Sequence, residues 1–437
     1  MRAIDAETIE LVETERINFP NFIHKKVLNK NLLIAPEYPT WIVLDDDEYD
    51  MFRILCEHTI EESLAIYRKN IHAQDPYSIR MSVLEKIFNN NFYREGFAQT
   101  QNEEIMDNIQ KSIHINVIND CNMRCKHCFI NAGRVEKQQI DIENILAKVR
   151  DITIINGYTS VTISGGEPLL HKNIFSLLEG LRGHKVSLFT NGILINESII
   201  DKLQPLVSNI QISMEGISAE KYEQNRGYGN YKKVLQAINL IKAKNIPLYL
   251  AVTILPDTLL DIEENLVDFV KMLDYKNMQI RLNNEIEMSG AALHELDLRN
   301  YDMQHSNIVV FNLMKKLGKL GFAVEPSKVK NIRFKNCGIG TSIVIDSDGK
   351  IYPCSYFSSY HIPYTASAKH IIKEFNTINN NTSIEHIEKC KDCELKYICS
   401  GGCKINNLVK NKNMIFTSCN DDFKQKQLEK LVNSELL

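Results

Sequence analysis

Three cysteines in one short segment have the spacing of an iron-sulfur site. Cys121, Cys125 and Cys128 form a CxxxCxxC array directly after the apolar run at residues 113–118, which predicts a strand. The irons of a four-iron cluster normally take one cysteine each, so three thiolates would leave one iron open to a small molecule. A zinc knuckle is the alternative, although zinc sites usually use CxxC pairs and four ligands. The aromatic residue Phe129 follows the last cysteine.

This array, with an aromatic residue after it at the end of a first strand, resembles the radical S-adenosylmethionine (AdoMet) enzymes. The resemblance implies that the open iron chelates the amino and carboxylate groups of AdoMet. It also implies that the cluster, reduced by an external electron donor such as flavodoxin or ferredoxin, cleaves the sulfonium to a 5'-deoxyadenosyl radical.

Further motifs at the ends of expected strands extend the resemblance to the AdoMet site. A GGEP motif at residues 165–168 follows an apolar run, and glycines let backbone groups approach a ligand closely. An arginine can neutralise a carboxylate with two parallel charge-assisted bonds. The resemblance implies that Gly165, Gly166 and Glu167 meet the methionine amino group, Ser213 the ribose, Arg226 the methionine carboxylate and Thr253 the adenine, with Phe129 also at the cofactor.

A second, larger set of cysteines follows later in the sequence. Its spacing is one cysteine, then GxxxxC, then CxxCxxxxxCxxxC and a final cysteine, which resembles the SPASM extension of radical AdoMet enzymes. That extension holds auxiliary four-iron clusters, and one or two zinc ribbons are the alternative. The cysteines of this set are Cys337, Cys354, Cys390, Cys393, Cys399, Cys403 and Cys419.

Two complete auxiliary clusters would need eight thiolates, and this set supplies seven. One auxiliary cluster is therefore expected to expose an iron to which a substrate thiolate could bind, unless the chain provides a non-cysteine ligand. The expected cofactors are AdoMet and three four-iron (4Fe-4S) clusters. The resemblance assigns Cys390, Cys393, Cys399 and Cys419 to an outer auxiliary cluster, and Cys337, Cys354 and Cys403 to an inner one.

The composition narrows the class of protein. A chain of 437 residues has room for two or three domains, and a formal charge of −4 gives no basic footprint for nucleic acid. No apolar run reaches the ~18 residues that span a bilayer, and the first thirty residues lack the plan of a secretory signal. We therefore expect a cytoplasmic protein with neither nucleic acid nor membrane as a partner. In that compartment eleven cysteines favour metal or redox chemistry over disulfides, and Cys56, outside both motifs, is expected in the core.

The strands that must carry these motifs are expected to alternate with helices from residue 112 onward. Six such units are fewer than the eight of a closed barrel. The predicted fold class is α/β, with a partial (β/α)6 radical SAM barrel whose active site lies at the C-terminal ends of the strands. The apolar runs that predict parallel strands buried on both faces are residues 113–118, 161–164, 186–190, 210–214, 248–254 and 278–282.

The segment before the barrel predicts a winged-helix-like module. Residues 31–36 and 40–44 predict two strands, and helices are expected after a cap at Asp45 and at a capping box that begins at Thr59. This order resembles the precursor-peptide recognition element of peptide-modifying radical enzymes, which adds a leader peptide as a strand to a sheet edge. A purely structural cap is the alternative. Residues 71–110 predict a helical linker.

The predicted domains are the recognition element at residues 1–100, the barrel at 101–300, and a bridging helix with the SPASM domain at 301–437. The favoured function is maturation of a ribosomally made precursor peptide that carries a leader sequence. The adenosyl radical would take hydrogen from an unactivated carbon, the auxiliary clusters would accept the electron released, and the product would be a cross-link, with a thioether favoured over a carbon–carbon bond or an inverted stereocentre.

Two other functions compete with peptide maturation. Anaerobic sulfatase-maturating enzymes share the barrel and the cysteine array but carry an aspartate directly after the GxxxxC cysteine, where this chain has Ser355. A non-enzymatic iron-sulfur electron carrier would leave the AdoMet motifs without purpose. No catalytic base is assigned, and the candidates near the strand ends are Glu215, Arg281, Asn283 and Glu285.

Overall fold

The computed structural model describes the chain except for residues 1, 4–8, 11–12, 71–74, 95–111, 158, 287, 300, 325–329, 357–359, 418 and 436–437. The chain forms two compact units. The barrel unit contains residues 109–325 and 338–378, and the terminal unit contains residues 1–108, 326–337 and 379–436. The predicted domain boundaries at residues 100 and 300 stay a prediction, because the compact units interleave the segments that those boundaries separate.

The barrel unit is built on one sheet with the strand order β12-β11-β10-β9-β8-β7-β6-β13-β14-β15. Neighbouring strands from β12 through to β13 are parallel, whereas β14 and β15 pair antiparallel. The predicted α/β class, partial barrel and six strands are confirmed. The strands are β6 (Ser112–Asn116), β7 (Ser160–Ser164), β8 (Val186–Thr190), β9 (Asn209–Met214), β10 (Leu248–Thr253), β11 (Met278–Asn283), β12 (Ala323–Val324), β13 (Ser342–Ile345), β14 (Lys350–Tyr352) and β15 (Ile362–Pro363).

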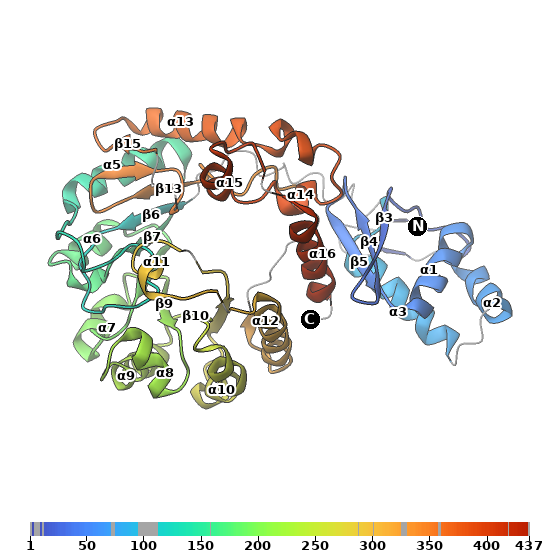
Figure 1. The fold of residues 1–437 in the computed structure, drawn as a ribbon, viewed down its shortest axis with the longest axis horizontal. Coiled ribbons are helices and arrows are strands. Elements are labelled where there is room, and N and C mark those ends of the chain that lie inside the picture. The colour runs from blue at the N-terminus through green and yellow to red at the C-terminus, as the bar shows by residue number, and fades with distance from the viewer. Residues whose placement is uncertain are drawn as a thin grey trace. The chain divides into compact units, whose positions relative to one another are not determined.

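Helices lie along the outside of these strands (Figure 1). The strands bury alternate residues, as in β6, where Ile113 and Ile115 are fully buried in the core while His114 and Asn116 lie on the opposite face. None of the described helices is both long and apolar enough to cross a membrane. The helices of this unit are α5 (Ile142–Asn156), α6 (Ile174–Gly180), α7 (Glu197–Leu203), α8 (Ala219–Arg226), α9 (Tyr231–Ala243), α10 (Leu259–Leu273), α11 (Ala292–Glu295) and α12 (Met303–Lys319), followed by α13 (Ala368–Asn381).

The terminal unit begins with a winged-helix-like module. Its antiparallel sheet has the order β3 (Ile23–Val27), β4 (Lys30–Ala35) and β5 (Thr40–Leu44), of which only β4 and β5 are predicted from the sequence. The alternation of apolar residues is weak in β3, whose residues are mostly exposed. Two short strands, β1 (Arg2–Ala3) and β2 (Ile9–Glu10), pair separately.

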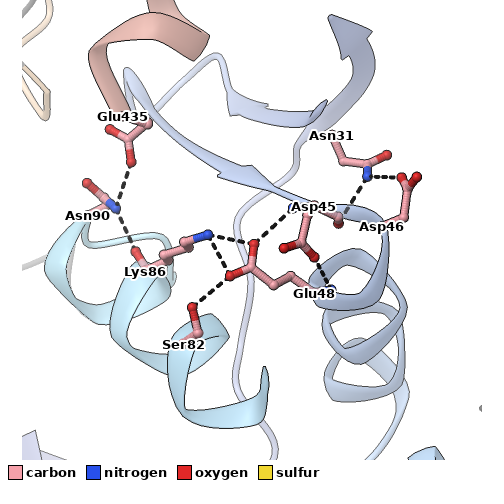
Figure 2. A network of polar contacts seen from close by, with 8 residues as sticks. All are labelled: Asn31, Asp45, Asp46, Glu48, Ser82, Lys86, Asn90 and Glu435. Atoms are coloured by element: carbon pink, nitrogen blue, oxygen red, sulfur yellow. Dashed lines mark hydrogen bonds and ion pairs between the residues drawn. The ribbon is translucent and has the colours of Figure 1, made fainter. Parts of the chain in front are cut away.

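The helices of this module are α1 (Asp46–Glu57), α2 (Ile60–Asn70) and α3 (Pro76–Asn89). The predicted cap at Asp45 is confirmed, because its side chain accepts from the Glu48 backbone at 2.8 Å and Glu48 accepts from the Asp45 backbone at 2.9 Å. Figure 2 shows the same Glu48 carboxylate bound by Lys86 of α3 at 2.5 and 2.6 Å. The capping box at Thr59 is also confirmed.

The predicted linker contains a helix that forms part of the core of the N-terminal module. Its helix α3 contributes Val83, Leu84 and Ile87 to the core of the module, beside the partly buried Cys56. Residues 71–74 and 95–111, the rest of that prediction, lie outside the described residues. Burial raises the pKa of the Cys56 thiol to about 12, so this cysteine is neutral, as a core residue should be.

The opposite face of the same sheet packs against C-terminal helices of the terminal unit. Leu32, Ile34 and Trp41 form one core cluster with residues of α14 (Lys396–Cys399) and α16 (Asp421–Glu435), and Cys393 and Cys399 pack against it. The sheet is therefore buried on both faces. The remaining elements of this unit are α15 (Lys404–Asn411) and two short 3-10 helices, η2 (Ile384–His386) and η3 (Glu388–Cys390).

Candidate active site

A cavity of about 680 Å³ opens in the barrel unit at the C-terminal ends of strands β7 to β11. The thiols of Cys121, Cys125 and Cys128 all line this cavity. Most of the predicted AdoMet contacts line it as well, so the structure brings together residues that are more than a hundred positions apart in the sequence. These contacts are Phe129, Gly165, Gly166, Ser213, Arg226 and Thr253.

The two glycines of the GGEP motif are needed because two backbones meet there. A Cβ on Gly165 would lie 2.4 Å from the Ile118 carbonyl oxygen, and one on Gly166 would lie 2.1 Å from that of Asp120. The backbone of Gly166 donates to the Ile118 carbonyl at 2.6 Å. The glycines thus hold the cysteine loop against the end of β7, a positioning role that the sequence motif alone does not reveal.

A third glycine also lies close to the cysteine loop. Gly290, with φ of +56°, would place a Cβ 2.5 Å from the Cys128 carbonyl oxygen, and the Ala291 backbone donates to that oxygen at 2.8 Å. No spacing motif marks Gly290 in the sequence, so only the fold reveals its role.

The cysteine thiols fit the cluster that the resemblance implies. Burial raises the pKa of Cys125 to about 11, against the opposing charge of Arg226, and burial also raises the pKa of Cys121. Thiolates at these positions need more positive charge than the chain alone provides, which bound iron would supply. Among the described residues, no three His, Cys, Asp or Glu side chains converge closely enough for a single metal ion. A four-iron cluster has a different spacing, because each cysteine binds a separate iron.

Glu215 is not the free acid or base that its position suggests. Its fully buried carboxylate pairs with Arg226 through Nε and, at 2.8 Å, through Nη2, and it also contacts Nε2 of His127 at 3.2 Å. Burial alone would raise the pKa of Glu215, but the charge of Arg226 outweighs it and, with His127, lowers the pKa to about 2. Glu215 is therefore a permanent negative charge that orients Arg226.

This pairing changes what Arg226 can offer AdoMet. Two of its nitrogens are taken by Glu215, and Nη1 lies 3.9 Å from the Met123 sulfur at the cavity. Glu215 occupies the Nε–Nη2 edge of the guanidinium, so the predicted pair of parallel bonds to a carboxylate could be made only from the Nη1–Nη2 edge.

Glu167 points away from the role that the motif implies. Its fully buried carboxylate accepts from Thr190 Oγ1 at 2.7 Å, from the Asn191 backbone at 2.9 Å and from the Leu169 backbone at 3.1 Å. It does not line the cavity. Instead it fixes Asn191, whose side-chain amide lies 3.9 Å from the Cys121 sulfur.

The lining of the cavity also carries a positive group that is held in place by its neighbours. Arg281 on β11 donates to Gln211 on β9 at 2.9 Å and stacks on the Tyr249 ring at 4.3 Å, and both Arg281 and Gln211 line the cavity. Asn283 and Glu285 line it as well and bond to each other locally. No side chain among these candidates is marked by the structure as a catalytic base.

Tyr356 is a cavity residue that the sequence reasoning missed. Its ring lies 5.9 Å from that of Phe129 at an angle of 53°, and both line the cavity. The signal that could have revealed it is its position two residues after Cys354, where the GxxxxC motif ends.

The auxiliary cysteines divide between the two units. All four cysteines of the predicted outer set, Cys390, Cys393, Cys399 and Cys419, line one cavity in the terminal unit, which fits a shared cluster. Burial, with the neighbouring thiols, raises the pKa of Cys390 to about 11. Of the inner set, Cys354 belongs to the barrel unit, and Cys337 and Cys403 belong to the terminal unit.

The comparison with known families agrees with the geometry of this site. Residues 115–269, from β6 to α10, match the Radical SAM superfamily. The chain carries a radical SAM domain and is an iron-sulfur enzyme that binds AdoMet.

The relatives of the chain include a bacteriocin biosynthesis protein and a sulfatase-maturating enzyme. The antilisterial bacteriocin subtilosin biosynthesis protein AlbA of Bacillus subtilis is 24% identical over 314 residues, covering 67% of this chain and 66% of AlbA. A cysteine-type anaerobic sulfatase-maturating enzyme of Clostridium perfringens is 26% identical over 319 residues, which cover 65% of this chain and 86% of that enzyme. The crystal structure of Streptococcus suis SuiB bound to its precursor peptide SuiA shares the fold, with a TM-score of 0.58 and 18% identity over 92% of this chain and 99% of SuiB.

Proposed function

We propose that this enzyme matures a ribosomally made precursor peptide by forming a cross-link, with a thioether as the favoured bond. The observation that carries the proposal is the convergence of the three-cysteine loop and the AdoMet residues on one cavity, in a chain that also has a separate winged-helix-like module. The fold match to SuiB supports it, because that match extends over both the barrel and the flanking segments of this chain.

The proposed reaction releases one electron. Bound AdoMet and a reduced cluster would supply the 5'-deoxyadenosyl radical, which takes one hydrogen atom from a substrate carbon and leaves as 5'-deoxyadenosine. Joining that carbon to a cysteine sulfur then releases the thiol proton and one electron. The auxiliary clusters that the two cysteine sets would hold are suitable acceptors for this electron. Together with the barrel cluster, three four-iron clusters are proposed. An external donor such as flavodoxin or ferredoxin would reduce the barrel cluster.

Residues that line the cavity would hold AdoMet. Arg226, oriented by Glu215, would face the methionine carboxylate, and Ser213 and Thr253 would contact the ribose and the adenine. The backbone at Gly165 and Gly166, rather than the Glu167 side chain, would receive the amino group. Phe129 and Tyr356 would cover the substrate side.

The leader peptide would add to the edge at β3. The two-residue turn Leu28-Asn29 has φ of +49° and +58°, so Val27 and Lys30 form the first bonded pair and the backbones of His24 and Lys26 point outward. The other edge, at β5, is partly occupied. Lys330 Nζ donates to the Trp41 carbonyl at 2.8 Å and the Asn331 backbone donates to that of Pro39 at 3.0 Å.

Deleting residues 1–100 would be a poor test of this role, because the sheet shares a core cluster with Cys393 and Cys399. The Lys26→Pro variant removes one outward N–H, whereas Lys26→Ala keeps it and loses the same side chain. We expect Lys26→Pro to weaken leader binding about five-fold relative to Lys26→Ala, since one hydrogen bond contributes about 1 kcal/mol. Uncoupled AdoMet cleavage should be the same in both variants. Equal leader affinity would exclude this edge.

The function itself is tested by mass spectrometry. The candidate precursor, a short cysteine-containing open reading frame beside the gene, is incubated anaerobically with reconstituted enzyme, AdoMet and a reductant. A loss of two hydrogens without free thiol supports a thioether. A formylglycine product on a sulfatase-derived peptide would instead support sulfatase maturation, which Ser355 disfavours because those enzymes carry an aspartate there.

A further inference from the structure

One lysine of the terminal unit is completely buried among the auxiliary cysteines. Lys404, the first residue of α15, follows Cys403 directly and has no exposed surface. A buried ammonium group is costly unless hydrogen bonds and negative charge compensate it. Neither the AdoMet site nor the proposed substrate cavity uses this residue, so its burial needs another explanation.

The main chain between two cluster cysteines folds around the Lys404 ammonium. Its Nζ donates to the Ser400 carbonyl at 2.7 Å and to the Gly402 carbonyl at 3.3 Å. Ser400, Gly401 and Gly402 all have positive φ, of 58°, 73° and 73°. A Cβ on Gly401 would lie only 3.0 Å from Nζ. The turn from Cys399 to Cys403 is thus shaped to enclose this charge.

The cysteines at the two ends of this turn belong to different predicted auxiliary sets. Cys399 is assigned to the outer set and Cys403 to the inner one, and the Lys404 ammonium binds the main chain between them. A four-iron cluster with thiolate ligands is an anion, so loading the cysteines supplies the compensation that a buried ammonium requires.

We propose that Lys404 is a fixed positive charge shared by both auxiliary cysteine sets, which raises the reduction potentials of the clusters they hold. Taking up one electron makes a cluster more negative by one charge, and a nearby ammonium stabilises that reduced state more than the oxidised one. Lys404 would thereby make the auxiliary clusters better acceptors for the electron released in product formation. Its charge acts on the clusters, and the side chain does not touch the substrate.

This inference rests on the proposed function only in requiring that auxiliary clusters are present. Iron analysis and electron paramagnetic resonance of the wild-type enzyme settle that point first. If only the barrel cluster is found, the proposed three-cluster enzyme fails. If the auxiliary clusters are found and their potentials do not depend on Lys404, this inference alone fails.

The test is an anaerobic redox titration of reconstituted full-length enzyme, followed by electron paramagnetic resonance. Lys404→Met removes the charge at similar length, Lys404→Gln removes the charge but keeps a hydrogen-bond donor, and Lys404→Arg keeps the charge. Lys410→Met removes an exposed lysine from the same helix and is the matched control. The cluster on Cys121, Cys125 and Cys128 is an internal reference in every sample.

We expect the auxiliary potentials to become more negative in both neutral variants and to stay near the wild-type value in Lys404→Arg and Lys410→Met. The barrel cluster should not shift. If the neutral variants lose auxiliary iron while Lys404→Arg keeps it, the charge is needed to hold the anionic clusters, which also supports the proposal. Loaded neutral variants with wild-type potentials would overturn it. Loss of auxiliary iron in Lys404→Arg as well would show that side-chain shape matters instead of charge.

Discussion

Replacing Glu215 by Gln tests the buried ion pair beside the cysteine loop. The substitution keeps the size of the side chain and removes the negative charge that faces Arg226 and His127. The pKa of Glu215 falls from the ordinary 4.5 to about 2 in the folded protein. At 1.36 kcal/mol per pKa unit, this difference corresponds to about 3 kcal/mol of stabilisation. A similar cost is typical of leaving a buried charge unpaired.

The pH dependence follows from the sign of this shift. The folded pKa is depressed, so the stabilisation is fully present above about pH 4.5 and is lost as the pH falls through about 2. Glu215 therefore stays ionised between pH 6 and 8, and its own titration adds no pH dependence to the difference between wild type and Glu215→Gln in that range.

Native-state hydrogen exchange measures this effect where it occurs. Amides of β9 and α8, which carry Glu215's neighbours and Arg226, should exchange about a hundredfold faster in Glu215→Gln at pH 7. The exposed Glu264 on α10 provides the control Glu264→Gln, which should not change exchange there. The double variant with Arg226→Met should lose less than the sum of the two single variants, because no buried charge is left unpaired. Unchanged protection in Glu215→Gln, or full additivity, would refute the importance of the pair.

Three further predictions concern other parts of the chain. Gly166→Ala should lose the iron of the barrel cluster, measured by iron analysis against wild type, because its Cβ would lie 2.1 Å from the Asp120 carbonyl oxygen; full iron content would contradict the close approach. Cys56→Ala should keep all the iron, since this thiol packs in the core of the N-terminal module, and lost iron would reveal a missed ligand. Asp45→Ala breaks the capping box and should destabilise the module by about 1 kcal/mol. Urea unfolding followed by the fluorescence of Trp41 measures this loss, and no change would mean that the cap is unimportant.

The sequence predicts the barrel well because its signals are local. Short apolar runs mark the strands, glycines or cysteines follow the first four of them, and the capping boxes at Asp45 and Thr59 mark two helix starts. The strand β3 is missed because its exposed residues do not alternate.

The sequence does not show which polar side chains form hydrogen bonds or ion pairs with one another. Glu167 and Arg226 carry the motif's residue types, yet Glu167 accepts from Thr190 and from two backbone N–H groups, and Glu215 occupies one edge of Arg226. Lys404 likewise looks like an ordinary helix residue in the sequence, and only the fold shows its ammonium fully buried against the main chain of the turn from Cys399 to Cys403. The partners of Glu167, Arg226 and Lys404 lie 23, 11 and 4 residues away in the sequence, and no spacing motif indicates that these groups meet.

The central claim is that Cys121, Cys125 and Cys128 hold a four-iron cluster whose open iron binds AdoMet. The most direct measurement is the electron paramagnetic resonance spectrum of dithionite-reduced enzyme with and without AdoMet, with Cys125→Ala as the control. We predict that AdoMet changes the spectrum of the wild-type enzyme and that this component is absent from Cys125→Ala, which still holds its auxiliary iron but forms no 5'-deoxyadenosine. Zinc bound at these cysteines, or a wild-type spectrum that AdoMet leaves unchanged, would contradict the claim.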